Sequence, residues 1–203
     1  MKRDRVSRIE PLAPREFPEE MRKAMAALRP PNATHRAPAT ENRPTALSVL
    51  GTMAHHPSLA RAFFTFNGHI LGASTLSERQ RELLIMRVAA VRKCGYEWAQ
   101  HLFMARDAGL TDEEIGRIAY GPDAPFWTES DAAMLRSVDE LIHDGVISES
   151  TWQLLAGDLN DQQLLDLIFT VGLYDILARL FASLELQIDD DIRELMKRYD
   201  ELF

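Results

Sequence analysis

The sequence predicts an all-α protein. From Thr45 onward, apolar residues recur every three or four positions, the period of an amphipathic helix, and no useful length of chain alternates apolar and polar residues as a strand does. Capping sequences, in which Ser, Thr or Asn is followed three residues later by Gln or Glu, occur at Ser77, Thr111 and Asn160. Because helix starts are marked and strands are not supported, we expect helices packed around a hydrophobic core.

The composition predicts a globular protein with one domain and an appendage. The chain has 203 residues, of which 46% are hydrophobic, so it can bury a full core. Its longest apolar runs are shorter than the roughly 18 residues that span a membrane, and no apolar signal segment follows the charged start. The single cysteine excludes an intrachain disulfide and fits a reducing compartment. We therefore predict a cytoplasmic protein with no membrane partner.

The first 44 residues are predicted to form a separate arm. They hold seven of the ten prolines, which fix the backbone and remove amide donors, so only one short helix is expected, from Pro18 to Leu28. Residues 1–50 contain ten basic and six acidic residues, although the whole chain has a net charge of -8. A basic arm over residues 1–44 is expected to pack against the acidic helical domain, residues 45–203, or against a neighbouring subunit. The acidic domain argues against a nucleic-acid partner.

Capping residues, glycines and prolines divide the helical domain into its elements. The run from Leu83 to Val91 is apolar almost all round, which predicts a buried helix. Gly95 is unfavourable inside a helix, so a break is expected at residues 93–95 with a new helix after it. The expected helices cover residues 45–53, 57–72, 77–93, 95–109, 111–120, 128–145, 148–156 and 160–186.

Two parts of the chain resemble each other at an offset of 83 residues. The identical pairs are Gln80 and Gln163, Leu84 and Leu167, Ile85 and Ile168, and Val88 and Val171. Leucines stand in the second copy at the positions that Cys94, Glu97 and His101 occupy in the first. The pattern predicts an internally duplicated helix unit in which only the first copy carries chemistry.

The chemistry of the chain concentrates at the start of the helix after the break. Cys94 is followed by Glu97 and His101, and steps of three and four residues place the three side chains within roughly 60° of one another on one helical face. A carboxylate one turn from an imidazole fixes its tautomer and raises its basicity, which favours general acid/base chemistry. Cys94 follows Arg92 and opens a helix, so a thiolate is favoured there. A buried thiol and a hydrogen-bonded core histidine are the alternatives.

Glu82 opens the buried helix and needs a partner or a function there. Arg87, in the same apolar run, is the expected counter-ion, and the pair would hold the helix or leave Arg87 to bind an anionic substrate. Glu82, Glu97 and His101 would hold a metal only with a further ligand from another helix. The candidates for that ligand are His55, His56 and His69. We predict neither a metal nor a cofactor.

Several motifs occur together at the spacing of a known family. They are Glu82, Arg87-Val88-Ala89, the block CGYEWAQH from Cys94 to His101, and Ala108-Gly109-Leu110-Thr111. Over residues 45–188 this pattern resembles the carboxymuconolactone decarboxylase and alkyl hydroperoxidase D superfamily, and it leaves the Pro-rich arm outside. The resemblance implies an all-helical, AhpD-like domain, often internally duplicated, that assembles as trimers or hexamers.

The two branches of that superfamily imply different chemistries. The hydroperoxidase branch has the motif Glu, then Cys-x-x-Cys-x-x-x-His, so by resemblance Glu82 and His101 would form a proton relay and Cys94 would be the first cysteine. Glu97 stands where that branch has its second cysteine, so Cys94 would need an external resolving thiol. The decarboxylase branch acts on a small lactone carboxylate by acid/base chemistry and needs no redox thiol.

The first interpretation is a decarboxylase-like enzyme for a small carboxylate or lactone. His101, oriented by Glu97 or Glu82, would move a proton, and Cys94 is the remaining catalytic candidate. An AhpD-like hydroperoxidase, a thiol antioxidant of the peroxiredoxin type, is the second interpretation, and a non-catalytic binding or assembly protein is the third. A homo-oligomer with the arm packed on a neighbour is expected. The candidate substrate-binding residues are Arg87, Tyr96, Trp98, His69 and Tyr174.

Overall fold

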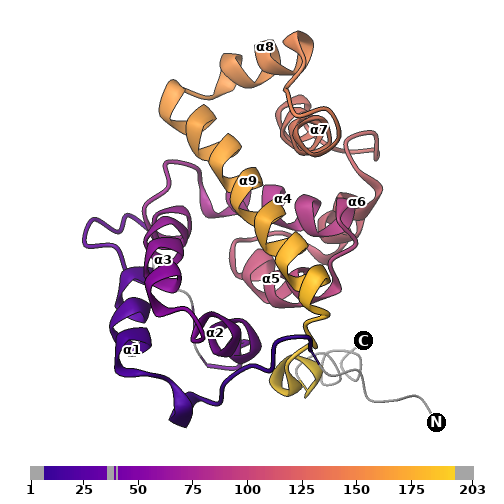
Figure 1. Cartoon of the computed structure of the whole chain (residues 1–203). Coiled ribbons are helices and arrows are strands. Elements are labelled where there is room, and N and C mark those ends of the chain that lie inside the picture. Colours follow the sequence, from indigo (N-terminus) through magenta and orange to yellow (C-terminus); the bar gives the residue numbers. More distant parts are fainter. Residues whose placement is uncertain (1–6, 36–38, 40, 195–203) are drawn as a thin grey trace, which may run out of the picture. The chain divides into compact units, whose positions relative to one another are not determined.

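The prediction of an all-α fold is confirmed. In the computed structural model, which describes residues 7–35, 39 and 41–194, every regular element is helical (Figure 1). The chain forms two compact units. Its two ends, up to Ala73 and from Leu180 onward, make up the end unit, and Ser74–Arg179 makes up the central unit.

The end unit contains the short helices that begin the chain. They are η1 (Pro14–Glu16), α1 (Glu19–Met25), η2 (Ala26–Leu28), α2 (Leu47–Met53) and α3 (Pro57–Gly72). Pro18 is the N-cap of α1, and the backbone becomes extended at Arg29, directly before Pro30. Within the segment predicted as an arm, helix therefore runs from Glu19 to Met25 and tightens into η2, and η1 precedes it.

The arm supplies core residues to the end unit. Phe17 and Met21 are buried in one cluster with Phe64 of α3. Gly68 of α3 permits a close approach of the arm, because a Cβ atom at that position would lie 2.4 Å from the carbonyl oxygen of Ala27. The arm thus packs against a helix of its own chain.

The C-terminal segment caps the start of α2. The N-cap residue, Ala46, has a φ of +54° and no side chain that can accept a hydrogen bond. Asp189 accepts one from the backbone N–H of Ser48 at 2.9 Å, and Asp191 accepts one from that of Thr45 at 2.9 Å. Asp189, from the other end of the chain, therefore satisfies one of the first amides of α2, and Asp191 binds the residue before its N-cap.

The central unit contains the remaining helices. They are α4 (Glu78–Val91), α5 (Gly95–Asp107), α6 (Asp112–Tyr120), α7 (Glu129–His143), α8 (Glu149–Asp158) and α9 (Asp161–Leu184), which continues into the end unit. The predicted capping boxes at Ser77 and Thr111 are both present. Asn160 and Gln163 exchange hydrogen bonds at the start of α9 in the same way. All three helix starts predicted from these sequences are confirmed.

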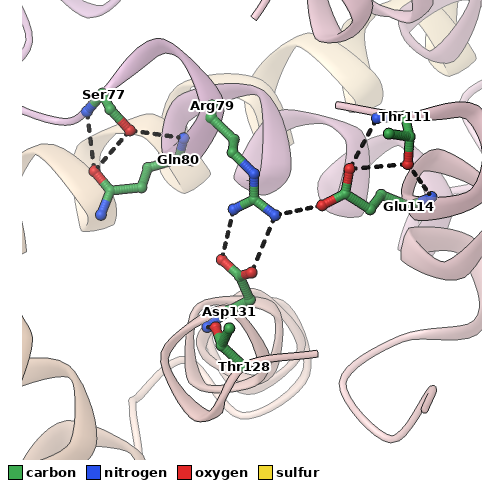
Figure 2. Close-up of polar contacts among 7 residues, drawn as sticks. All are labelled: Ser77, Arg79, Gln80, Thr111, Glu114, Thr128 and Asp131. Atoms are coloured by element: carbon green, nitrogen blue, oxygen red, sulfur yellow. Dashed lines mark hydrogen bonds and ion pairs between the residues drawn. The ribbon is translucent and has the colours of Figure 1, made fainter. Parts of the chain in front are cut away.

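Arg79 joins the starts of three helices (Figure 2). Its two terminal nitrogens donate to the two carboxylate oxygens of Asp131 on α7, at 2.8 and 3.0 Å, and Nη2 also donates to Oε1 of Glu114 on α6 at 2.6 Å. The Glu114 carboxylate also accepts the backbone N–H of Thr111, the N-cap of α6, and the backbone N–H of Asp131 donates to Oγ1 of Thr128, the N-cap of α7. One guanidinium therefore ties the first turn of α4 to the first turns of α6 and α7.

The break between α4 and α5 sets the position of the candidate site. The side chains from Leu83 to Met86 are fully buried, as predicted for α4. Lys93 then takes a φ of +53°, and α5 begins at Gly95 with Cys94 as its N-cap. The predicted break is confirmed, and it allows α5 to pack alongside α4 (Figure 1).

The helix α9 repeats the burial of α4 without its break. Leu167, the counterpart of Leu84, is fully buried, as Leu84 is. At the counterpart of Cys94, which is Leu177, α9 continues without interruption to Leu184. The two copies therefore agree in their first turns and differ where the first copy carries its polar side chains.

By length and composition, α9 is apolar enough to cross a membrane, a property found in no other helix among the described residues. The core helix of a globular protein meets the same measure. In the central unit Tyr174 and Leu167 are buried, and Asp175 accepts a hydrogen bond from Arg92 of the segment after α4. These are the contacts of a helix that is packed within a protein.

Candidate active site

Glu82 and His101, on two different helices, form a hydrogen-bonded pair. Nδ1 of His101 on α5 lies 2.8 Å from Oε2 of Glu82 on α4. Glu82 is fully buried, and His101 is 8% exposed, so the imidazole lies at the solvent side of the pair. The break at Lys93 and the packing of α5 on α4 bring together two groups that are 19 residues apart.

Glu82 is held as a carboxylate by two partners. Burial acts to raise its pKa, but the charge and hydrogen bond of His101, followed by those of Arg81, outweigh burial and lower the pKa below its ordinary value. Nε of Arg81 donates to Oε1 of Glu82 at 3.1 Å, and the Arg81 side chain is 6% exposed. When His101 is neutral, its Nδ1–H points at the carboxylate and Nε2 is the acceptor, so Nε2 is the atom that exchanges a proton.

Tyr174 of α9 packs edge-on against His101. The ring centroids are 4.9 Å apart, and the ring planes are 87° from parallel. Burial, and then the charge of Glu82, raises the pKa of Tyr174 well above its ordinary value, so the phenol keeps its proton. Tyr174, a candidate substrate-binding residue, therefore packs beside the imidazole as an uncharged side chain.

Cys94 is a buried thiol at the N-cap of α5. Burial raises the pKa of Cys94 to about 11, and it outweighs the backbone N–H groups of Glu97 and Tyr96, which donate to the sulfur. The expectation that this helix start holds a thiolate is therefore wrong. Arg92, the expected positive neighbour, forms an ion pair with Asp175.

Glu97 is a buried carboxyl group without a hydrogen-bond partner. Its side chain on α5 is 1% exposed, and neither Oε1 nor Oε2 has a partner. Burial, and then the negative charge of Asp175, raises the pKa of Glu97 well above its ordinary value. Of the two carboxylates predicted to orient His101, Glu82 is therefore the one that does so.

Arg87 does not pair with Glu82, so that prediction is wrong. Nε and Nη2 of Arg87 each lie 2.7 Å from a carboxylate oxygen of Asp139 on α7, and Nη1 donates to the carbonyl oxygen of Ile118 at 2.9 Å. A step of five residues turns a helix by about 140° from its starting face, so Arg87 points away from Glu82. The contacts of Arg87 join α4 to α6 and α7 and give no support to a substrate-binding role.

Arg81 is the residue of the site that sequence reasoning missed. Its only signal in the sequence is its place next to Glu82, and adjacent residues on a helix point about 100° apart, so the pairing is not apparent from spacing. Only the long guanidinium side chain can bend across that angle.

The other predicted residues lie in different surroundings. The hydroxyl of Tyr96, a buried residue of α5, accepts a hydrogen bond from Gln100 at 3.2 Å, and Trp98 is half-buried on the same helix. His69 is exposed on α3, in the end unit, so the Glu82–His101 pair forms without it. Among the described residues, no group of three or more His, Cys, Asp or Glu side chains is placed to hold a metal ion.

Comparison with known proteins gives one family and a set of similar folds. The model of the carboxymuconolactone decarboxylase family matches residues 57–140. No curated protein matches the chain. A solved structure described as an alkylhydroperoxidase AhpD core, an uncharacterized peroxidase-related protein from Ralstonia eutropha JMP134, has a TM-score of 0.63 at 18% identity, covering 80% of this chain and 95% of that one.

Two further structures share the fold. An uncharacterized peroxidase-related protein from Silicibacter sp. TM1040 has a TM-score of 0.63 at 18% identity, over 81% of this chain and 95% of that one. The debrominase Bmp8, solved without ligand, has a TM-score of 0.70 at 15% identity, over 97% of this chain and 98% of that one. At these identities the likeness is one of fold, and the fold is the AhpD-like helical one.

The family match contains the residues of the candidate site. Glu82, Cys94, Glu97 and His101 all fall within residues 57–140. The fold around them is the one seen in AhpD-like structures. The chain therefore carries a match to the carboxymuconolactone decarboxylase family over residues 57–140 and has an AhpD-like helical fold.

Proposed function

We propose that the chain is an enzyme that transfers a proton at the carbon next to a carboxylate or carbonyl group of a small substrate, as a decarboxylase-like lyase does. The observation that carries the proposal is the 2.8 Å contact between Nδ1 of His101 and Oε2 of Glu82. A buried carboxylate on one ring nitrogen fixes the tautomer and orientation of the imidazole and leaves Nε2 to meet the substrate.

The proposed reaction needs only proton transfer. The bond between the substrate's carboxylate carbon and its neighbour breaks, carbon dioxide leaves, and the bonding electron pair moves into an adjacent carbonyl or lactone group as an enolate. His101, protonated at Nε2, gives its proton to the carbon, and a proton from water restores the imidazolium. Glu82 stays ionised throughout and stabilises the imidazolium. A positioned acid/base group of this kind contributes about 10²–10⁴-fold to a rate, which suits an activated substrate.

A thiol reaction is the second candidate, and one observation favours it. The debrominase, which matches nearly the whole chain, was also solved as a cysteine-to-alanine variant in complex with 2,3,4-tribromopyrrole. In a thiol peroxidase reaction, the sulfur of Cys94 would bond to one peroxide oxygen, the O–O bond would break, and an external thiol would reduce the resulting sulfenate. Burial, which raises the pKa of Cys94 to about 11, opposes this reading because the thiolate is the reactive form.

The two candidates are separated by assaying one protein sample for two products. Carboxymuconolactone, the substrate in the family's name, is supplied to the purified chain and carbon dioxide release is followed. A second aliquot receives cumene hydroperoxide with dithiothreitol as the external thiol, and peroxide loss is followed. We expect carbon dioxide release above the spontaneous rate. Peroxide reduction without carbon dioxide release would replace the first candidate with the second.

A further inference from the structure

The side chain of Glu97 is an unexplained polar group inside the candidate site. It is 1% exposed, and both of its carboxyl oxygens are buried without a hydrogen-bond partner. A buried polar group that makes no hydrogen bond costs about 1–3 kcal/mol, and other buried carboxylates of this unit, such as Glu82, have partners. Among the residues that the structure describes, no hydrogen bond therefore compensates the burial of this carboxyl group.

The surroundings of Glu97 place it with the reacting groups. It lies one helical turn from both Cys94 and His101 on α5, and the charge of an ionised Glu97 acts on Cys94 and on Tyr174, which packs against His101. Burial, and then the negative charge of Asp175, raises the pKa of Glu97. A raised pKa favours the protonated carboxyl group, which can donate a hydrogen bond through its O–H.

We propose that Glu97 donates a hydrogen bond to a carbonyl or lactone oxygen of the bound substrate, on which negative charge develops during the reaction. The inference rests on the proposed function, and it defines the substrate class: small molecules in which the carbon that loses carbon dioxide or a proton is adjacent to a carbonyl or lactone group. Glu97 keeps its proton, and the hydrogen bond strengthens as the enolate forms.

The chemistry of the site favours an uncharged donor. A second carboxylate beside Glu82 would repel a developing oxyanion, whereas a neutral acid stabilises it without a counter-charge. In a site closed to water, one such donor contributes about 10²–10³-fold to the rate. His101 and Glu97 then have separate roles. His101 gives its proton to the substrate carbon, and Glu97 donates a hydrogen bond to the carbonyl or lactone oxygen.

The protonation state is tested by isotope-edited infrared spectroscopy of the full chain with labelled glutamate. At neutral pH the difference between wild type and Glu97→Gln should contain the carbonyl stretch of a protonated carboxylic acid. Glu82→Gln is the matched control, because it removes a second buried glutamate that is ionised and should remove only carboxylate bands. When γ-butyrolactone is added at increasing concentration, the Glu97 band should move to lower frequency. A carboxylate band for Glu97, or a band that the lactone leaves in place, overturns the proposal.

Kinetics on carboxymuconolactone distinguish a failure of this proposal from a failure of the proposed function. Glu97→Leu, which fills the space without a donor, should lower kcat by about 10²–10³-fold, and Glu97→Gln, which keeps an N–H donor, should lower it by less than about 10-fold. Carbon dioxide release at wild-type rate by Glu97→Leu overturns the donor role and leaves the proposed function standing. A shifted infrared band without any carbon dioxide release keeps the donor and overturns the reaction class.

Discussion

His101 Nδ1 lies 2.8 Å from Glu82 Oε2, and the two residues belong to helices that are separated by residues 92–94, of which Lys93 has a left-handed backbone. Without this break the helix of Glu82 would continue, and residues 19 positions apart would lie about 28 Å from each other along its axis. The break therefore creates the pair on which the proposed proton transfer depends.

The free energy of unfolding should fall as the pH rises from about 5 to about 8, through Glu97. Because its pKa in the folded chain is raised above the ordinary value of 4.5, Glu97 contributes stability that is fully present below that value and is lost as the pH rises toward its folded pKa. The loss is at most about 1.4 kcal/mol per pH unit. Urea unfolding of Glu97→Gln should show a flatter pH dependence than wild type.

Glu140→Gln is the control for that experiment, because Glu140 lies on α7 and does not pair with His101. Burial acts to raise the pKa of Glu140, but hydrogen bonds from Ser148 and Thr151 outweigh burial and lower it below the ordinary value of 4.5, so its contribution is lost only as the pH falls through the folded pKa. This variant should keep the wild-type slope between about pH 5 and about pH 8. Equal slopes for wild type and Glu97→Gln would show that Glu97 is ionised in the folded chain.

Cys94 should react slowly with iodoacetamide at neutral pH. A rise of its pKa from 9.0 to about 11 lowers the thiolate fraction about 100-fold, and burial slows access further. Mass spectrometry of the alkylated chain measures the rate, and the urea-unfolded chain, which should react like free cysteine, is the control. A folded chain that reacts faster than free cysteine would favour the thiol candidate.

Replacing Arg79 with Met should lower the free energy of unfolding by about 1–3 kcal/mol, because it leaves Asp131 and Glu114 without their shared partner. Their side chains are only 13% and 24% exposed. The matched control is Lys23→Met, which removes the ion pair between Lys23 and Glu19. These two side chains are 72% and 76% exposed, so the substitution should change the free energy of unfolding by less than about 0.5 kcal/mol. Equal losses in urea unfolding would mean that the Arg79 network does not stabilise the central unit.

Gly121→Ala should destabilise the chain, and Gly116→Ala should not. Gly121 has a φ of +110°, and a Cβ atom there would lie 2.7 Å from Nη2 of Arg87, so a loss of about 1–3 kcal/mol is expected. Gly116 lies inside α6 with nothing within 4 Å of an added Cβ, and alanine there should raise helix stability by about 0.5–1 kcal/mol. Thermal unfolding of both variants measures the difference, and a stabilised Gly121→Ala would contradict the assigned packing of Arg87.

The helices could be predicted because their signals are local. The capping boxes at Ser77 and Thr111 and the break before Gly95 depend on residues within one turn of each other, and all three are present. The aspartate that caps α2 could not be predicted, because Asp189 lies 141 residues from Ser48. When the capping residue is this distant in the sequence, tertiary packing decides which residue caps the helix.

The candidate site was predicted in part. The resemblance to the hydroperoxidase branch implied the pair of Glu82 and His101, whereas Arg81 was not predicted. Spacing along the chain placed Cys94, Glu97 and His101 at one helix, but it could not show which carboxylate contacts His101, since Glu82 reaches it from another helix. Nor could it show that burial raises the pKa of Cys94 and of Glu97, because a helical wheel does not measure burial.

The rate of carbon dioxide release from carboxymuconolactone by His101→Ala, compared with that by Cys94→Ser, tests the proposed chemistry most directly. We expect His101→Ala to lose about 10²–10⁴-fold in kcat, because no other group can replace the proton carrier oriented by Glu82. Cys94→Ser should stay within about 10-fold of wild type, since its thiol takes no part in the proton transfer. Full activity of His101→Ala together with inactivity of Cys94→Ser would contradict the account and assign the reaction to the thiol.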